Sequence, residues 1–293
     1  MRRLRRLTNW TDLSARAALA SHRLVGWVFF DPVAVAHYTA LGVPNGFGYY
    51  ITSRGAPLLS AGHQALAAAF ATINPLFVQV CVETALEHTT ATEIADARNR
   101  AVAEGLRLHV PEIVDELAAL EAPLWAVADA LSSSGRVLFA AHRQWPRPED
   151  PLVSAWLAVN CLREWRGDTH FAILVSEDIA AVEAGILDDA HRNYGGWIPR
   201  SRGADDDTLA TAFASLEERG LAEDGAVNAA GLARRDDIEK RTDRLTVRCW
   251  QLLGEERTEQ FLALVEPVGA RLVQRIDDTV GPQWMPAARD RRP

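Results

Sequence analysis

Signals that begin and end helices recur along almost the whole chain, whereas the alternation typical of strands is nearly missing. Asp31-Pro32 and the pair Thr90 and Glu93 are patterns that begin helices, and Gly220 stands where helices end. Period-two alternation occurs only around 226–227 and at 137–140. The sequence therefore predicts a mainly α fold.

The length of 293 residues suggests about two domains, at roughly 150 residues each. The clearest linker is 193–207 (NYGGWIPRSRGADDD), and Gly- and Pro-rich loops are expected at 43–57 and 146–151. We expect a helical domain over 1–192 with a candidate ligand pocket, and a second domain over 193–293. Helices are expected over about 11–24, 32–41, 60–73, 76–87, 91–107, 111–131, 152–166 with 168–175 as a continuation, 176–188, 207–219, 229–253 and 256–279.

The net charge of −8 argues against nucleic acid as the main partner, because phosphate binding requires a basic surface. The basic N-terminus is not followed by an apolar signal segment, and no run approaches the ~20 apolar residues of a membrane span. We therefore expect a cytoplasmic protein without a membrane partner.

Motifs for metals and nucleotide cofactors are missing from the sequence. Cys81, Cys161 and Cys249 are far apart with no CxxC, and no HExxH occurs. Neither GxGxxG nor GxxxxGK[ST] nor GxSxG is present. We expect buried thiols, no metal site and no cofactor.

The stretch LATAFASLEERGLAEDGAVNAAGLARRDDIEKRTDRL (209–245) resembles the second half of a MarR-type winged helix. In that pattern a recognition helix ends in "LEERGL", a two-stranded wing follows, and "AG" opens the next helix. Between 204 and 224, seven acids stand against one base, Arg219, and the wing is reduced to the turn at 223–225. Because phosphate contacts need cations, this element is expected to pack on the helical body or to meet protein, with DNA as the less favoured partner.

A cluster of polar residues, LREWRGDTH (162–170), lies between two apolar stretches. In a helix Arg163, Arg166 and His170 share one face, with Asn160 one turn earlier. Two arginines can hold a carboxylate or phosphate, and His170 oriented by Asp168 could act as acid or base. The alternative is an internal salt-bridge network that ties the two domains together.

Four further residues are candidates for the same site. His22 stands at the start of an apolar run, and Asn74 precedes Pro75 between two apolar helices. Tyr50 lies in the aromatic loop, and Trp165 lies within an apolar helix, where aromatic rings pack in cores or line pockets. For Asn74 the alternative is a simple helix break, and for Trp165 simple core packing.

Several segments in order resemble a group of actinobacterial helix-turn-helix family proteins of unknown function. They are His22 with Asp31-Pro32, GYYITSRGAP (48–57), Ile73-Asn74-Pro75, LREWRGDTH (162–170) and the MarR-like tail. The resemblance covers roughly residues 18–250. Thr169, where a glycine is common, and 71–73 depart from the pattern, which suggests a reshaped pocket.

These features lead to two hypotheses. The first is a small-molecule-binding protein or cofactor-independent enzyme of specialised metabolism, which holds an apolar ligand with an anionic or polar end. Its chemistry would be cyclisation, isomerisation, elimination or hydrolysis, with His170, Asp168 and His22 catalytic. The ligand would be bound by Arg163, Arg166, Asn74, Tyr50, Trp165 and Asn160. The second is a MarR-type regulator whose pocket senses a ligand; relatives of that type are commonly dimers, so a homodimer is possible by analogy.

Overall fold

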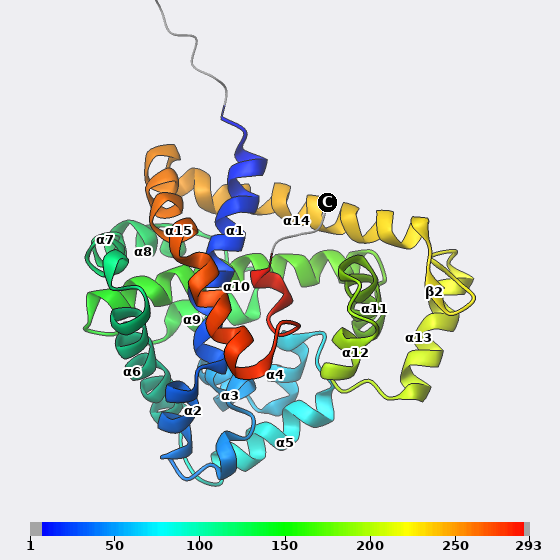
Figure 1. Ribbon diagram of the computed structural model, residues 1–293, viewed down its shortest axis with the longest axis horizontal. Helices are drawn as coiled ribbons and strands as arrows, with labels where there is room; N and C mark the ends of the chain where they lie inside the picture. Colours follow the sequence, from blue (N-terminus) through cyan, green and yellow to red (C-terminus); the bar gives the residue numbers. More distant parts are fainter. Residues whose placement is uncertain (1–7, 290–293) are drawn as a thin grey trace, which may run out of the picture.

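A computed structural model describes residues 8–289, and it is mainly helical, as the sequence predicts (Figure 1). Its α-helices are α1 (Trp10–Gly26), α2 (Pro32–Thr39), α3 (Tyr49–Gly55), α4 (His63–Phe70), α5 (Pro75–Leu86), α6 (Ala91–His109), α7 (Val114–Ala119), α8 (Glu121–Ala130), α9 (Val137–Gln144), α10 (Pro151–Ser176), α11 (Ala181–Arg192), α12 (Trp197–Ser201), α13 (Asp206–Glu218), α14 (Ala229–Leu253) and α15 (Glu255–Val280). Short 3-10 helices are η1 (Trp27–Phe30), η2 (Pro44–Gly46), η3 (Ala56–Ala61), η4 (Pro111–Ile113) and η5 (Pro286–Ala288).

Two helix starts follow the expected capping chemistry. The Asp31 carboxylate accepts from Val33 N at 2.9 Å, and Pro32 opens α2. Thr90 and Glu93 exchange both bonds of a capping box at the start of α6. These side chains satisfy backbone N–H groups that have no partner in the first turn of a helix, and so they fix where each helix begins.

Three expectations for local structure are wrong. Residues 49–55, expected as a loop, form α3, because their side chains are buried and tertiary packing overrides the Gly- and Pro-rich composition. Residues 137–140, a possible strand, begin α9, which buries Leu138 and Phe139. The expected linker 193–207 contains α12, which buries Ile198.

Buried apolar side chains form two cores that share two long helices. The first core contains side chains from α1 to α10 and from 249–288, and the second runs from Ile173 to Ile238. α10 and α14 both lie along the long axis of the molecule, pack against each other and contribute to both cores (Figure 1). The division between the cores therefore does not fall at the expected boundary after residue 192.

The stretch with the resemblance to a winged helix contains a helix, a hairpin and a second helix. α13 is followed by β1 (Ala222–Glu223) and β2 (Ala226–Val227), which pair antiparallel with Ala222 opposite Val227. Asp224 and Gly225 both have positive φ, as the tight two-residue turn requires. Asn228 then caps α14 by accepting from Gly231 N at 3.1 Å. Assignment of this element to the winged-helix class stays a prediction.

Within residues 8–289 the structure has no helix that is both long enough and apolar enough to cross a membrane.

Candidate functional site: a cavity rich in arginine

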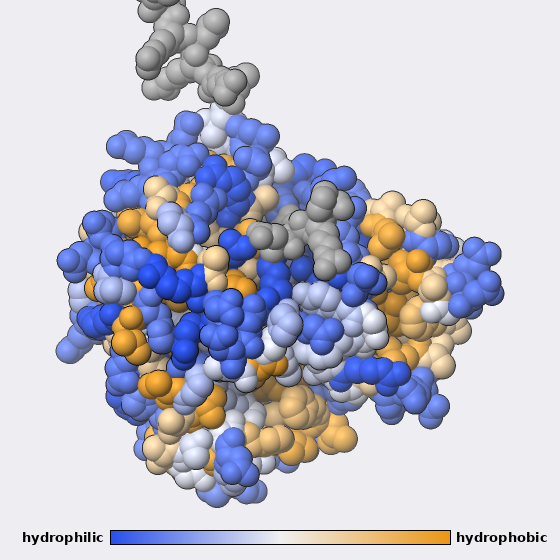
Figure 2. Space-filling model, viewed as in Figure 1, coloured by the Kyte–Doolittle hydropathy of each residue, from blue (hydrophilic) through white to orange (hydrophobic). Residues whose placement is uncertain are grey.

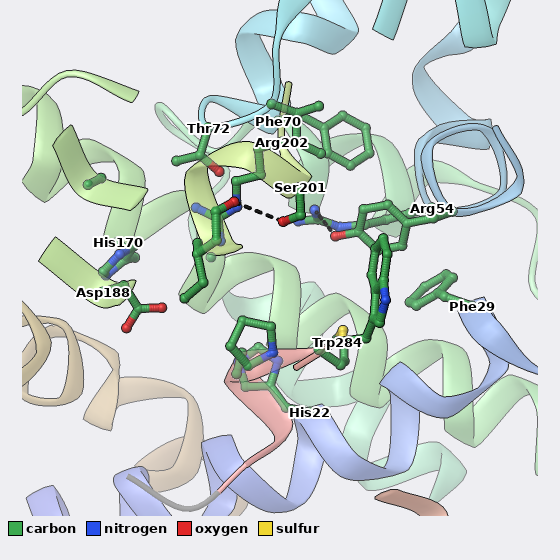
Figure 3. A pocket seen from close by; sticks show the side chains of 18 of the residues that line it. His22, Phe29, Arg54, Phe70, Thr72, His170, Asp188, Ser201, Arg202 and Trp284 are labelled. Carbon is green, nitrogen blue, oxygen red and sulfur yellow. Dashed lines mark hydrogen bonds between the residues drawn. The ribbon is translucent and has the colours of Figure 1, made fainter. Parts of the chain in front are cut away.

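A cavity of about 530 Å³ lies where α1, α3, α4, α10, α11, α12, α14 and the segment after α15 converge (Figure 3). Its size is within the range of pockets that enclose small organic molecules. Figure 3 shows His22, Arg54, His170, Arg202 and Trp284 around it, although they come from distant parts of the sequence. The site is therefore assembled by the tertiary fold and not by one contiguous motif.

Aromatic rings form one wall of the cavity, with Tyr50 at their centre. Phe30 stacks on Tyr50 with a centroid distance of 5.9 Å, and Phe29 and Phe70 meet it edge-on at 5.4 and 6.1 Å. Phe30 in turn contacts Trp284 at 5.3 Å. Such a wall provides apolar surface for a ligand and holds its own geometry through ring–ring contacts.

Two arginines share one carboxylate at the end of this wall. Arg54 donates from Nε to Glu164 Oε1 at 2.8 Å and from Nη2 to Oε2 at 2.7 Å, and Arg163 donates to Glu164 Oε1. The exposed fractions are 7% for Arg54, 6% for Arg163 and 0% for Glu164. Burial raises the pKa of Glu164, but Arg163 and Arg54 outweigh burial and hold it well below its usual value. Two buried cations thus face one carboxylate.

A neutral histidine supports this cluster from behind. His142 Nε2 lies 2.9 Å from the carbonyl oxygen of Arg54, so Nε2 carries the proton and donates it. Its Nδ1 then accepts from Asn160 Nδ2 at 3.3 Å, and Asn160 Oδ1 accepts from Arg163 Nη2 at 3.0 Å. Burial lowers the pKa of His142 to about 3. This network fixes the positions of Arg54 and Arg163 without adding charge.

A second polar wall joins α10 to α14. Arg166 donates to Glu239 at 3.1 Å and to Asp243 at 2.9 Å. His170 Nδ1 lies 3.0 Å from the Thr242 hydroxyl, which itself donates to the carbonyl of Ile238. His170 therefore donates from Nδ1, and Nε2 is left as an acceptor. Burial lowers the pKa of His170, so the ring is neutral at pH 7.

Three further arginines lie around Asp188. Its Oδ1 accepts from Arg192 Nε at 3.1 Å and from Arg235 Nη2 at 2.8 Å. Burial raises the pKa of Asp188, but these two arginines outweigh burial and lower it. Arg202, also on the cavity wall, has no hydrogen bond or ion pair of its guanidinium with any residue of 8–289. Asp188 acts on this guanidinium through its charge alone, without a hydrogen bond.

His22 adds an imidazole from α1 to the same cavity. Its Nδ1 is buried and has no hydrogen-bond partner among the described residues. Burial, with Arg163 and Arg166 nearby, holds the pKa of His22 well below its usual value. The neutral ring is therefore a polar group without a competing partner from the protein at that nitrogen.

Five of the nine candidate residues line the cavity, namely His22, Tyr50, Arg163, Arg166 and His170. Asp168 does not orient His170, because its Oδ2 accepts from the backbone N of Phe139 at 2.9 Å. Asn74 caps α5 and donates to the carbonyl of Gly203 at 3.2 Å. The expected pairing of Asp168 with His170 and the ligand contact of Asn74 are thus corrected.

Trp165 and Asn160 do not line the cavity and instead make contacts that stabilise the fold. Trp165 Nε1 donates to the carbonyl of Ser132 at 3.0 Å, and Arg136 lies over its ring at 4.5 Å. The expected internal salt-bridge network exists as well, since Arg163 and Arg166 are both ion-paired. The paired arginines are also part of the cavity wall, and their role in a ligand site stays a prediction.

Sequence reasoning missed several lining residues, which are Arg54, Asp188, Arg192, Arg202, Arg235, Glu239, Phe70, Trp197 and Trp284. Arg54 lies in segment 48–57, which was singled out by its resemblance to the family. Because that segment was expected to be a loop, Arg54 was not expected to be buried. Arg202 stands in the expected linker, where a charged residue is normally solvated. For the remaining residues the sequence carries no signal that they meet in one cavity.

The fold and the cavity define a mainly helical protein with an arginine-lined cavity. Over residues 14–279 the chain matches the model of the helix-turn-helix family, and it belongs to that family. Neither the curated proteins nor the solved structures contain a match to the chain. Among the described residues there is also no group of three or more His, Cys, Asp or Glu side chains that could hold a metal ion.

Proposed function

We propose that the protein binds a small apolar organic anion in this cavity. The observation that supports the proposal is the excess of arginine. Seven arginines line the cavity, and two of them, Arg166 and Arg289, pair with carboxylates of their own. The other five face the buried Glu164 and the partly buried Asp188; they are Arg54, Arg163, Arg192, Arg202 and Arg235. Arg235 also reaches Asp236 at 3.5 Å, but the Asp236 side chain is largely exposed.

Uncompensated buried cations are costly, and an anion that accepts from them relieves that cost. Arg202 is the group best placed to donate, since no protein partner holds it. Asp188 acts on Arg202 through its charge without a hydrogen bond, and the charges of Arg192 and Arg54 also act on it. The anionic end of a ligand is therefore expected at Arg202, among these arginines. The aromatic wall around Tyr50 then contacts the apolar part of the ligand.

Two fluorescent probes test this proposal, 1-anilinonaphthalene-8-sulfonate and N-phenyl-1-naphthylamine. They share their rings and differ by the sulfonate. We expect saturable binding of the sulfonate probe with one site per chain, at least about tenfold tighter than the neutral probe, as one charge-assisted hydrogen bond implies. Equal affinity for both probes would refute the proposal.

Arg202→Gln and Arg200→Gln form a matched pair for the same measurement. Arg202 lines the cavity, whereas Arg200, two residues earlier, is exposed and pairs with Asp206 at 2.7 Å. We expect Arg202→Gln to weaken the sulfonate probe by about tenfold or more and to leave the neutral probe unchanged. Arg200→Gln should bind both probes like the wild type.

We also propose cofactor-free acid–base chemistry on the ligand, but with fewer catalytic residues than the sequence suggested. Of the three expected catalytic residues, His22 and His170 line the cavity and Asp168 does not. Thr242 takes the orienting role at His170. The proposed catalytic groups are therefore the neutral imidazoles of His22 and His170, and Nε2 of His170 is the candidate proton acceptor.

The alternative function is a ligand-responsive transcription regulator, with which the family description is compatible. The charge of α13 speaks against DNA as the partner. Its one nearby base, Arg219, donates to the carbonyl oxygens of Asp178 and Glu177 and to Glu183, so it is held against the protein. We expect no retention on heparin at low salt, and salt-dependent retention would favour the regulator.

A further inference from the structure

The mouth of the cavity is apolar, whereas its inner end is cationic. Val280 and Phe77 both line the cavity and yet are 39% and 41% exposed, so the cavity reaches the surface at these side chains. Phe47 contacts Phe77 edge-on at 6.0 Å and is exposed too, as is the adjacent Leu76. Figure 2 shows the hydrophobic surface over α5, the helix of Leu76 and Phe77.

A shallow groove between α2 and the end of α15 adjoins this mouth. Phe30, Val35 and Val280 line both the cavity and the groove. The remaining groove residues are Pro32, Ala36, Thr39, Ala40 and Thr279. Apolar surface thus continues from the aromatic wall to the outside of the molecule.

The two hydroxyls in the groove are already used by the backbone. Thr39 Oγ1 donates to the carbonyl of Val35 at 2.8 Å, and Thr279 Oγ1 donates to the carbonyl of Arg275 at 2.9 Å. The groove therefore offers a ligand contact area and no free hydroxyl proton. Apolar surface of this kind at the opening of a binding site favours an apolar occupant.

We infer that the ligand is an amphiphile, a carboxylate or related anion with an extended alkyl chain, which binds with its head inside and its tail along the α2–α15 groove. The inference rests on the proposed function, since the anion site sets the direction of the chain. Charge fixes the head at the arginines, and the continuous apolar lining past Phe30 and Val35 guides the tail outward.

Displacement of 1-anilinonaphthalene-8-sulfonate by straight-chain carboxylates of 6, 8, 10 and 12 carbons, below their micelle concentrations, tests the inference. We expect the affinity to rise by about fourfold per methylene across the series. If the affinity stops rising at 8 carbons while the short acids still displace the probe, the inference of a tail in the groove is wrong and the proposed function stands. No displacement by any acid, with no preference for the charged probe, overturns the proposed function itself.

Charged substitutions in the groove provide the second arm. Ala36 and Ala40 are exposed groove residues one helical turn apart, and Val33 is an exposed residue of α2 that lies outside the lining of both the cavity and the groove. Ala36→Glu or Ala40→Glu should weaken the 12-carbon acid by about tenfold or more and leave the 6-carbon acid unchanged, because the new carboxylate repels burial of the tail. Val33→Glu should match the wild type. If Ala36→Glu and Ala40→Glu bind the long acid like Val33→Glu, the groove does not hold the tail.

Discussion

Arg54 and Glu164 lie 110 residues apart in the sequence and form a bidentate ion pair inside the protein, with N–O distances of 2.8 and 2.7 Å. The pair joins α3 to the middle of α10 and also forms part of the cavity wall on its arginine side. Binding chemistry and stability therefore depend on the same carboxylate.

Glu164→Gln should be strongly destabilising. It leaves the guanidiniums of Arg54 and Arg163 buried without their counter-ion, which typically costs about 3–5 kcal/mol. Urea or thermal unfolding measures the loss. Asp129→Asn is the control, because the Asp129–Arg147 pair lies at the surface and should contribute little. Equal losses of unfolding free energy in the two variants would show that the buried pair contributes no more to stability than the surface pair.

Asp168→Asn should change how stability depends on pH. Burial raises the pKa of Asp168 to about 7, whereas it is about 3.9 in an unfolded chain. Between these values the folded state binds more protons, so this group's stabilising contribution is complete below pH ~4 and is lost as the pH rises through 7.

The asparagine does not titrate and keeps an acceptor for Phe139 N. We therefore expect the free energy of unfolding of Asp168→Asn, relative to wild type, to increase from pH 5 to pH 8 in urea titrations. Parallel profiles for the two proteins would contradict the raised pKa, and Asp129→Asn serves as the exposed control.

The tautomer of His170 can be tested directly. Long-range ¹H–¹⁵N NMR should show the proton on Nδ1 and an imidazole that titrates below 6.5, because burial lowers its pKa. Thr242→Val removes the acceptor of that proton and should redistribute the tautomers. Thr246→Val, one turn further along α14, is the control and should leave the His170 signals in place. An unchanged spectrum in Thr242→Val would disprove the orienting role.

Asn74 links the start of α5 to the segment after α12 that bears Arg202. Its backbone N donates to the carbonyl of Arg202 at 2.9 Å, and its side chain both caps α5 and donates to Gly203. Asn74→Ala should lose about 1 kcal/mol of stability through the cap.

Asn74→Asp separates the two roles, because it retains the capping oxygen and loses the donor to Gly203. We expect it to stay as stable as wild type while amide hydrogen exchange accelerates in residues 200–205. Exchange that accelerates in Asn74→Ala but not in Asn74→Asp would assign the effect to the cap alone.

The polar stripe on α10 was predictable, because helical periodicity alone puts Arg163, Arg166 and His170 on one face. The same periodicity turns Asp168 by about 200° from His170, so a partnership between them within one helix was geometrically unsound. Arg54 and Arg202 escaped prediction for a different reason. Composition suggested loops at both places, and only long-range packing makes Arg54 a buried residue and turns Arg202 toward the cavity.

α10 and α14 each have one end in the first core and the other end in the second core. Neither core can melt without removing partners from the other, so heat or denaturant should take the molecule apart in a single transition. A fragment ending at residue 192 would lack Trp250 and Phe261 of the first core and Leu216 of the second. The two halves of this chain are therefore expected to fold and unfold together, and neither half is expected to stay folded when it is expressed alone.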